Sequence, residues 1–269
     1  MVNSLHFDTP RKGQVMPEIW EHPFSHAQLK VERAKKHITD LEERIRTSPD
    51  TYPPSLKIDG ETGEQFLYYA LTDRTFKREI ALIAGDAIHN LRCALDFAWC
   101  GVIKQFSPTS LTRWTQFPVP DSREKLIGDL TKTGKISRTS PVFDLMVERV
   151  KSHKGGDSDI CAIHALDIDD KHILLVPVIH FVRIDGVELQ DEEGSILHNL
   201  IATNRNVGYR INVPVGCHVK NNGQATIKVV FPRETITEGL EVIPTLWTFY
   251  GKTREIVRRL QRMVADAKR

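Results

Sequence analysis

This chain of 269 residues lacks the short motifs by which many enzyme classes are recognised. It contains no GxGxxG or GxxxxGK[ST] phosphate loop, no GxSxG nucleophile elbow and no HExxH metal motif. Its four cysteines form no CxxC pair, and Cys93 and Cys100 lie too far apart on one helical pattern to form a disulfide. We therefore expect small buried thiols in a reducing compartment.

The sequence also lacks a strong net charge and an uninterrupted apolar run. The net charge is only +2, so no strong global field attracts the chain to nucleic acid or membrane. The N-terminal 14 residues have no apolar segment of the kind found in secretory signals. The run 80–103 is long enough to span a bilayer, but charges near its middle argue against this. We therefore expect a cytoplasmic protein without membrane association.

What the sequence does contain is typical of a globular protein: 40% apolar and 27% charged residues. Runs of helical periodicity are separated from runs of strand-like residues, which indicates an α+β fold rather than a parallel βαβ sheet. We predict a bundle of four or five helices with an attached antiparallel β-sheet built from hairpins. The predicted single domain, 1–269, comprises an N-terminal arm (1–24), a mainly helical part (25–172) with a hairpin at 55–71, antiparallel strands (173–232) and a C-terminal helix (240–267) that packs back on the bundle.

Several local signals refine this prediction. Dipeptides Asp185-Gly186 and Asn222-Gly223 each predict a tight hairpin turn. Ser140 and Asp157 (or Ser158) are suitable helix N-caps. The first helix is expected to bury an apolar stripe of Leu29, Ala34, Ile38, Leu41 and Ile45.

One stretch, "GDAIHNLRCALDFAW" (85–99), puts five polar residues into the longest predicted helix, 72–105. At 100° per residue these side chains form one stripe, in which His89, Arg92 and Asp96 are neighbours. Gly85 is expected to let another backbone approach the stripe. The five polar residues are Asp86, His89, Asn90, Arg92 and Asp96.

The segment "DIDDKH" is expected to supply the opposite wall, because it ends a helix just before a strand. A His beside a carboxylate and a cation is suited to acid/base work near neutral pH, and an Arg can hold a phosphate. We therefore predict a site that needs no cofactor. The predicted catalytic residues are His89, Arg92, Asp96 and His172, and the predicted binding residues are Asp86, Asn90, Asp170 and Lys171.

Two other interpretations of the same residues stay open. Arg92 and Asp96 also form an ordinary i,i+4 ion pair, so the stripe is equally explained as a structural polar network. A metal site is the other alternative, although no metal-binding motif supports it. Its ligands would be the N and O donors of Asp86, His89, Asp170 and His172.

Three segments resemble a group of uncharacterised bacterial and phage proteins that carry a helix reading GDxxHNLRSALDH and a later DKHR. These segments are "GDAIHNLRCALDFAW", "FPVP" (117–120) and "LDIDDKHILL", and the resemblance spans scattered motifs between Leu29 and Leu175. The Arg-and-His helix also resembles the HEPN superfamily of helical proteins, which includes toxin and defence ribonucleases with an Arg followed four to six residues later by a His. Here Phe97 stands in place of that His, and Ile173 replaces the Arg after "DKH".

The resemblance implies a HEPN-like protein that acts on RNA or a nucleotide, in phage defence or a toxin system, by metal-independent acid/base chemistry. His89 or His172 would then substitute for the missing His. The alternative is a non-enzymatic binding or assembly module, in which the polar cluster is structural and the sheet or the basic C-terminal helix contacts a protein partner. The long apolar helix faces also permit a homodimer.

Overall fold

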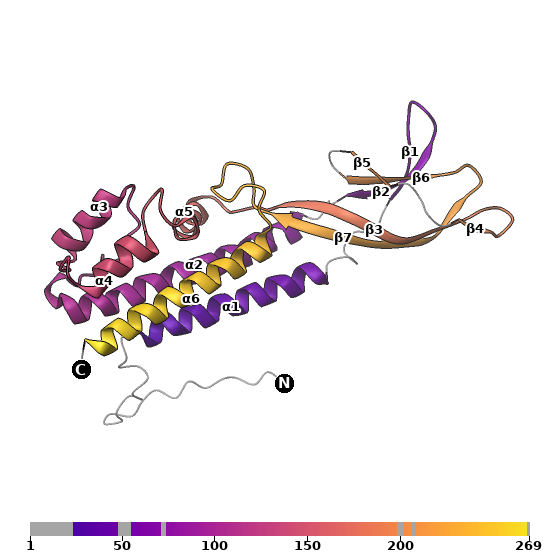
Figure 1. Cartoon of the computed structure of the whole chain (residues 1–269). Coiled ribbons are helices and arrows are strands. Elements are labelled where there is room, and N and C mark those ends of the chain that lie inside the picture. Colours follow the sequence, from indigo (N-terminus) through magenta and orange to yellow (C-terminus); the bar gives the residue numbers. More distant parts are fainter. Residues whose placement is uncertain (1–23, 48–54, 71–73, 198–201, 206–207, 268–269) are drawn as a thin grey trace, which may run out of the picture. The chain divides into compact units, whose positions relative to one another are not determined.

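The computed structural model describes residues 24–47, 55–70, 74–197, 202–205 and 208–267. The predicted N-terminal arm lies outside these residues except for Phe24, which is fully buried. The fold is α+β, with helices and antiparallel sheets, as predicted (Figure 1). The helices are α1 (Ser25–Arg46), α2 (Arg74–Phe106), α3 (Arg123–Gly128), α4 (Pro141–Asp144), α5 (Ser158–His172) and α6 (Val242–Asp266).

The chain divides into two compact units. Unit 1 consists of Met1–Glu32, Leu91–Cys161 and Lys252–Arg269, and unit 2 of Arg33–Asn90 and Ala162–Gly251. Four of the helices, α1, α2, α5 and α6, contribute residues to both units. No helix in the described part of the chain is both long and apolar enough to cross a membrane.

All the strands in the described part of the chain belong to unit 2. One sheet has the order β1-β2-β6-β5 and the other the order β4-β3-β7. The strands are β1 (Ser55–Ile58), β2 (Gln65–Ala70), β3 (Val178–Gln190), β4 (Ile196–Leu197), β5 (Ala202–Arg205), β6 (Gly208–Val213) and β7 (His218–Val230). Alternation along β2 turns Leu67 and Tyr69 inward, where they share one core with Leu189 of the other sheet. The Tyr69 hydroxyl donates to the carbonyl of Asn222 in β7, which ties the two sheets together.

The hairpin predicted at 55–71 is present as β1 and β2, which pair antiparallel. The two predicted turns at Asp185-Gly186 and Asn222-Gly223 are wrong. Both dipeptides lie inside β3 and β7, which form one long antiparallel ribbon in which Asp185 pairs with Gln224 and Val187 with Asn222 (Figure 1). Gly186 and Gly223 do have positive φ, 71° and 70°, but the ribbon continues through them. Both glycines therefore adopt the positive φ that a hairpin turn needs. The long-range pairing of β3 with β7 nevertheless places them inside the ribbon and not at a turn.

Unit 1 is helical, and the local capping signals explain its short helices. Ser122 and Ser140 accept hydrogen bonds from the backbone N–H groups of Lys125 and Val142. α3 continues into a π-helical turn at 129–133, and α4 continues into another at 145–150. Asp157 caps α5 through the N–H groups of Asp159 and Ile160.

The buried stripe of α1 differs from the predicted one. Leu29 is 52% exposed, and Ala27 and Val31 occupy the buried positions one turn apart instead. Ala34, Ile38 and Leu41 are fully buried, as expected. Because helical spacing allows two overlapping stripes at this end of α1, tertiary packing chose between them.

Candidate functional site

The polar stripe of α2 is divided between the two units. Arg92 and Asp96 belong to unit 1, while Asp86, His89 and Asn90 belong to unit 2 together with the "DIDDKH" segment. Each group has its own set of partners within its own unit.

In unit 1, Arg92 is almost completely buried, at 4% exposure. Its Nη2 donates to the carbonyl oxygen of Phe117 at 2.8 Å and to Oδ1 of Asp96 at 3.0 Å. The same Asp96 oxygen accepts the backbone N–H of Phe117 at 2.8 Å. The pair thus satisfies both backbone groups of one loop residue, whose ring also packs edge-on against Trp99 at 6.2 Å. We call Arg92, Asp96 and Phe117 the Arg92 clamp.

In unit 2, His89 bonds to a carboxylate that the sequence analysis did not single out. His89 Nδ1 lies 2.8 Å from Oδ1 of Asp167, and Lys171 Nζ donates to Oδ2 of Asp167 at 2.6 Å. The Asp167 side chain is only 4% exposed, whereas those of His89 and Lys171 are 47% and 53% exposed. Neutral His89 meets this contact by donating its Nδ1–H to Oδ1 of Asp167. The contact therefore favours the tautomer that carries its proton on Nδ1.

Asp170 packs directly against Gly85. A Cβ atom at position 85 would lie 2.3 Å from Oδ2 of Asp170, so a larger residue there would force the Asp170 side chain to move. The group that approaches Gly85 is therefore a side chain and not, as we expected from the sequence, a backbone. Oδ1 of Asp170 is buried and has no hydrogen-bond partner among the described residues.

The surroundings of Asp170 raise the pKa of its carboxyl group. Burial is the largest cause, and the negative charges of Asp86 and Asp167 add to it. The backbone N–H of Leu175 and the nearby His89 oppose the shift. Asp170 is therefore a carboxyl group whose ionised form is poorly stabilised by its own fold.

The α1 helix adds a second histidine near this cluster. The pKa of His37 is lowered, first by burial and next by Arg33, while Asp86 and Asp40 act in the opposite direction. The unit 2 cluster contains several carboxylates and the basic Lys171, and the basic Arg33 of α1 lies near it. We call His89, Asp167, Asp170 and Lys171, with the exposed Asp86, the His89 cluster.

The other predicted site residues are placed as follows. Asn90 is buried and donates from Nδ2 to the backbone oxygen of Asp86 on its own helix, at 2.7 Å. His172, at the end of α5, is exposed and has no side-chain partner among the described residues. Phe97, which stands where the HEPN pattern has its His, lies edge-on to the His26 ring at 5.5 Å.

The structure therefore brings together only some of the residues predicted to form one site. "DIDDKH" does meet the helix that carries His89, but through Asp167 and Asp170 rather than His172. A sequence signal for Asp167 was available, because Asp167, Asp170 and Lys171 are spaced i, i+3 and i+4 on one helical face. Among the described residues, no three His, Cys, Asp or Glu side chains are grouped to hold a metal ion, so the four ligands of the metal alternative do not form such a centre.

Comparison with known proteins identifies no relative of this chain. No protein-family model, no curated protein and no solved structure matches the chain.

Proposed function

We propose that this chain is a binding or assembly module, in which the polar residues of α2 support the fold. The observation that carries this proposal is the Arg92 clamp. A guanidinium at 4% exposure that bonds to Phe117 and Asp96 has little surface left for a substrate phosphate. The clamp holds a loop segment against its helix, which is a structural task.

Replacing Arg92 tests this role. Arg92→Ala leaves the Phe117 carbonyl without this donor and the partly buried Asp96 carboxylate without its guanidinium partner. Removing one member of such a buried pair costs about 3 kcal/mol. We expect the melting temperature to fall by roughly 5–10 °C, measured by differential scanning calorimetry. Arg78→Ala is the matched control, because Arg78 is exposed on the same helix. Equal melting temperatures for both variants would contradict the proposal.

A second candidate function is acid/base chemistry on RNA or a nucleotide, as in a HEPN-like toxin or defence protein. The half-exposed His89, oriented by the buried Asp167, supports it, since a general base needs a fixed tautomer and an accessible second nitrogen. The charge of the cluster argues against it: Asp86, Asp167 and Asp170 outnumber Lys171, and a phosphate would have to approach them. For this reason the binding module is the better supported function.

A cleavage assay separates the two candidates. If His89 is a general acid or base, RNA is cleaved in the presence of EDTA, and His89→Ala slows cleavage by about 10²–10⁴-fold. Asp167→Asn should then also slow cleavage, because an amide oxygen and NH₂ group no longer fix the tautomer of His89. If the wild-type protein leaves both single-stranded and structured RNA intact, the second candidate is rejected and the binding module is the function that stays supported.

A further inference from the structure

The two units differ in charge, and the excess of positive charge lies in unit 1. Unit 1 contains 21 Lys and Arg against 14 Asp and Glu, whereas unit 2 contains 16 against 21. The modest net charge of the whole chain therefore conceals a basic unit and an acidic one. Such local excess creates a field that attracts a partner of opposite charge.

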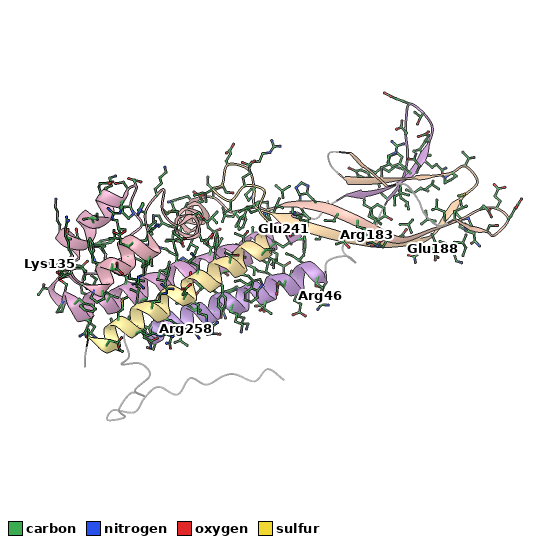
Figure 2. The ribbon with its side chains drawn as sticks, in the orientation of Figure 1. Arg46, Lys135, Arg183, Glu188, Glu241 and Arg258 are labelled. Carbon is green, nitrogen blue, oxygen red and sulfur yellow. The ribbon has the colours of Figure 1, made fainter. Side chains whose placement is uncertain are left out.

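Part of this positive charge is aligned on the C-terminal half of α6. Arg254, Arg258 and Arg262 are all exposed and follow one another at intervals of four residues (Figure 2 labels Arg258). At a rise of 1.5 Å per residue, successive arginines are about 6 Å apart along the helix axis. None of the three has an ion-pair partner among the described residues, whereas the neighbouring Arg259 pairs with Glu255. We call these three residues the α6 arginine row.

The arginine row borders a hollow in the surface of unit 1. Arg254 and Arg258 form one wall of a pocket of about 230 Å³ between α6 and the first turns of α1. Val31 and Val257 are also part of its lining, and Gln28 and Glu32 belong to the α1 side. Gln28 Nε2 also donates to Oε1 of Gln261 on α6 at 2.9 Å, which holds the two helices together beside the pocket.

From these observations we propose that the α6 arginine row binds the phosphate backbone of a nucleic-acid strand. This proposal rests on the binding-module function and names its partner. Guanidinium groups bind phosphates with two parallel hydrogen bonds, and a straight, evenly spaced row fits a linear polyanion. Sequence-independent binding to single strands uses such a basic groove along the backbone.

The composition of α6 favours this partner over a protein or a membrane. Protein interfaces depend on buried apolar and aromatic anchors, and helices that lie on membranes present a broad apolar face. The exposed large hydrophobic residues of the described chain include none from α6. In its second half, Ile256, Val257, Leu260 and Val264 are buried. The outward side of its second half therefore offers charge and hydrogen-bond donors but no apolar anchor.

Binding of a fluorescein-labelled 20-nucleotide RNA, measured by fluorescence anisotropy in EDTA with the full chain, tests the proposal. With three phosphate contacts, a plot of the logarithm of the association constant against the logarithm of salt concentration should have a slope of about −2. The association constant should therefore fall roughly twentyfold between 50 and 200 mM salt. The triple variant R254A/R258A/R262A should lose at least about tenfold in affinity at 50 mM salt and most of this slope. Glu32→Gln should bind more tightly, because it removes a negative charge from the pocket lining.

The matched control is K104A/K132A/R138A, which removes three exposed positive charges elsewhere in unit 1. If both triple variants weaken binding equally, the effect is one of net charge and the assignment to α6 is overturned. It is also overturned if wild-type protein binds no RNA, or if it binds phosphatidylserine vesicles and not RNA. Loss of RNA binding in the α6 variant with an unchanged melting temperature supports the proposal. Because Arg92→Ala is read by melting temperature, failure of the clamp and failure of the arginine row are distinguishable.

Discussion

Among the residues that the structure describes, units 1 and 2 each contain one buried arginine, which holds a loop or turn. In unit 1, Arg92 holds the backbone of Phe117 with help from Asp96. In unit 2, Arg210 of β6 is 8% exposed and bonds to Asp59 and Glu64, at either side of the β1–β2 turn. Arg92 acts on backbone groups within a helical unit, whereas Arg210 acts on side chains across a sheet. The same residue type therefore serves two architectures because a guanidinium can satisfy several acceptors at once.

The surroundings of the two arginines also differ. The Arg210 guanidinium lies 3.9 Å from the centroid of the Phe66 ring, on the outer face of its sheet. The pKa of Asp59 is lowered, first by the Glu61 backbone N–H and next by the Arg210 hydrogen bond. The unit 2 arginine thus has charged and aromatic partners, while the partners described above for the unit 1 arginine include a carboxylate and a backbone carbonyl.

The largest effect expected in unit 2 comes from removing Arg210. Arg210→Ala takes away two ion-pair partners and a cation–π contact at a buried position, and we expect a loss of about 3 kcal/mol of unfolding free energy. Hydrogen exchange should show the loss of protection in β1, β2 and β6, and little change in unit 1. Arg183→Ala is the control, because Arg183 is exposed and pairs only with Asp185. Loss of protection spread evenly over both units would show that the units do not respond separately.

An intermediate effect is expected at Gly85, where unit 2 packs a carboxylate against a helix. Gly85→Ala forces the Asp170 side chain to move, which costs about 1–3 kcal/mol and outweighs the helix-propensity gain of about 1 kcal/mol. In an Asp170→Ala background the carboxylate is absent, so the same Gly85→Ala change should become stabilising. Urea unfolding of the four proteins of this double-mutant cycle measures the coupling. An equal effect of Gly85→Ala in both backgrounds would contradict the packing described for Asp170.

The smallest effect concerns the pH dependence of unit 2. Because the folded pKa of Asp170 is raised above its unfolded value, the folded state holds this proton more tightly than the unfolded state does. Its contribution to stability is therefore present at low pH and is lost as pH rises from about 4 through the folded pKa. Asp170→Asn should raise the melting temperature slightly at pH 7 relative to wild type, and the difference should disappear at pH 3. Asp40→Asn, at an exposed position of unit 2 that is not a cause of the Asp170 shift, is the control. A lower melting temperature for Asp170→Asn at pH 7 would reverse the sign of this argument.

Much of the fold was accessible from local sequence. The β1–β2 hairpin and the caps at Ser140 and Asp157 are all present. These features depend on residues within a few positions of each other, so a local sequence pattern can predict them. The candidate site was only partly accessible: helical spacing put His89 and Arg92 on one stripe, but it did not identify their partners.

The sequence by itself determined the α+β class, the amphipathic helices and the chemical character of α2, because these follow from periodicity and side-chain type. Only the tertiary structure decided how these parts are used. In the folded protein, Gly186 and Gly223 lie within a long antiparallel ribbon and not in hairpin turns. Asp167 is the hydrogen-bond partner of His89. The tertiary structure also buries Arg92 against Phe117. In each case the deciding contact joins residues far apart in the chain, and such contacts depend on packing rather than on local preference.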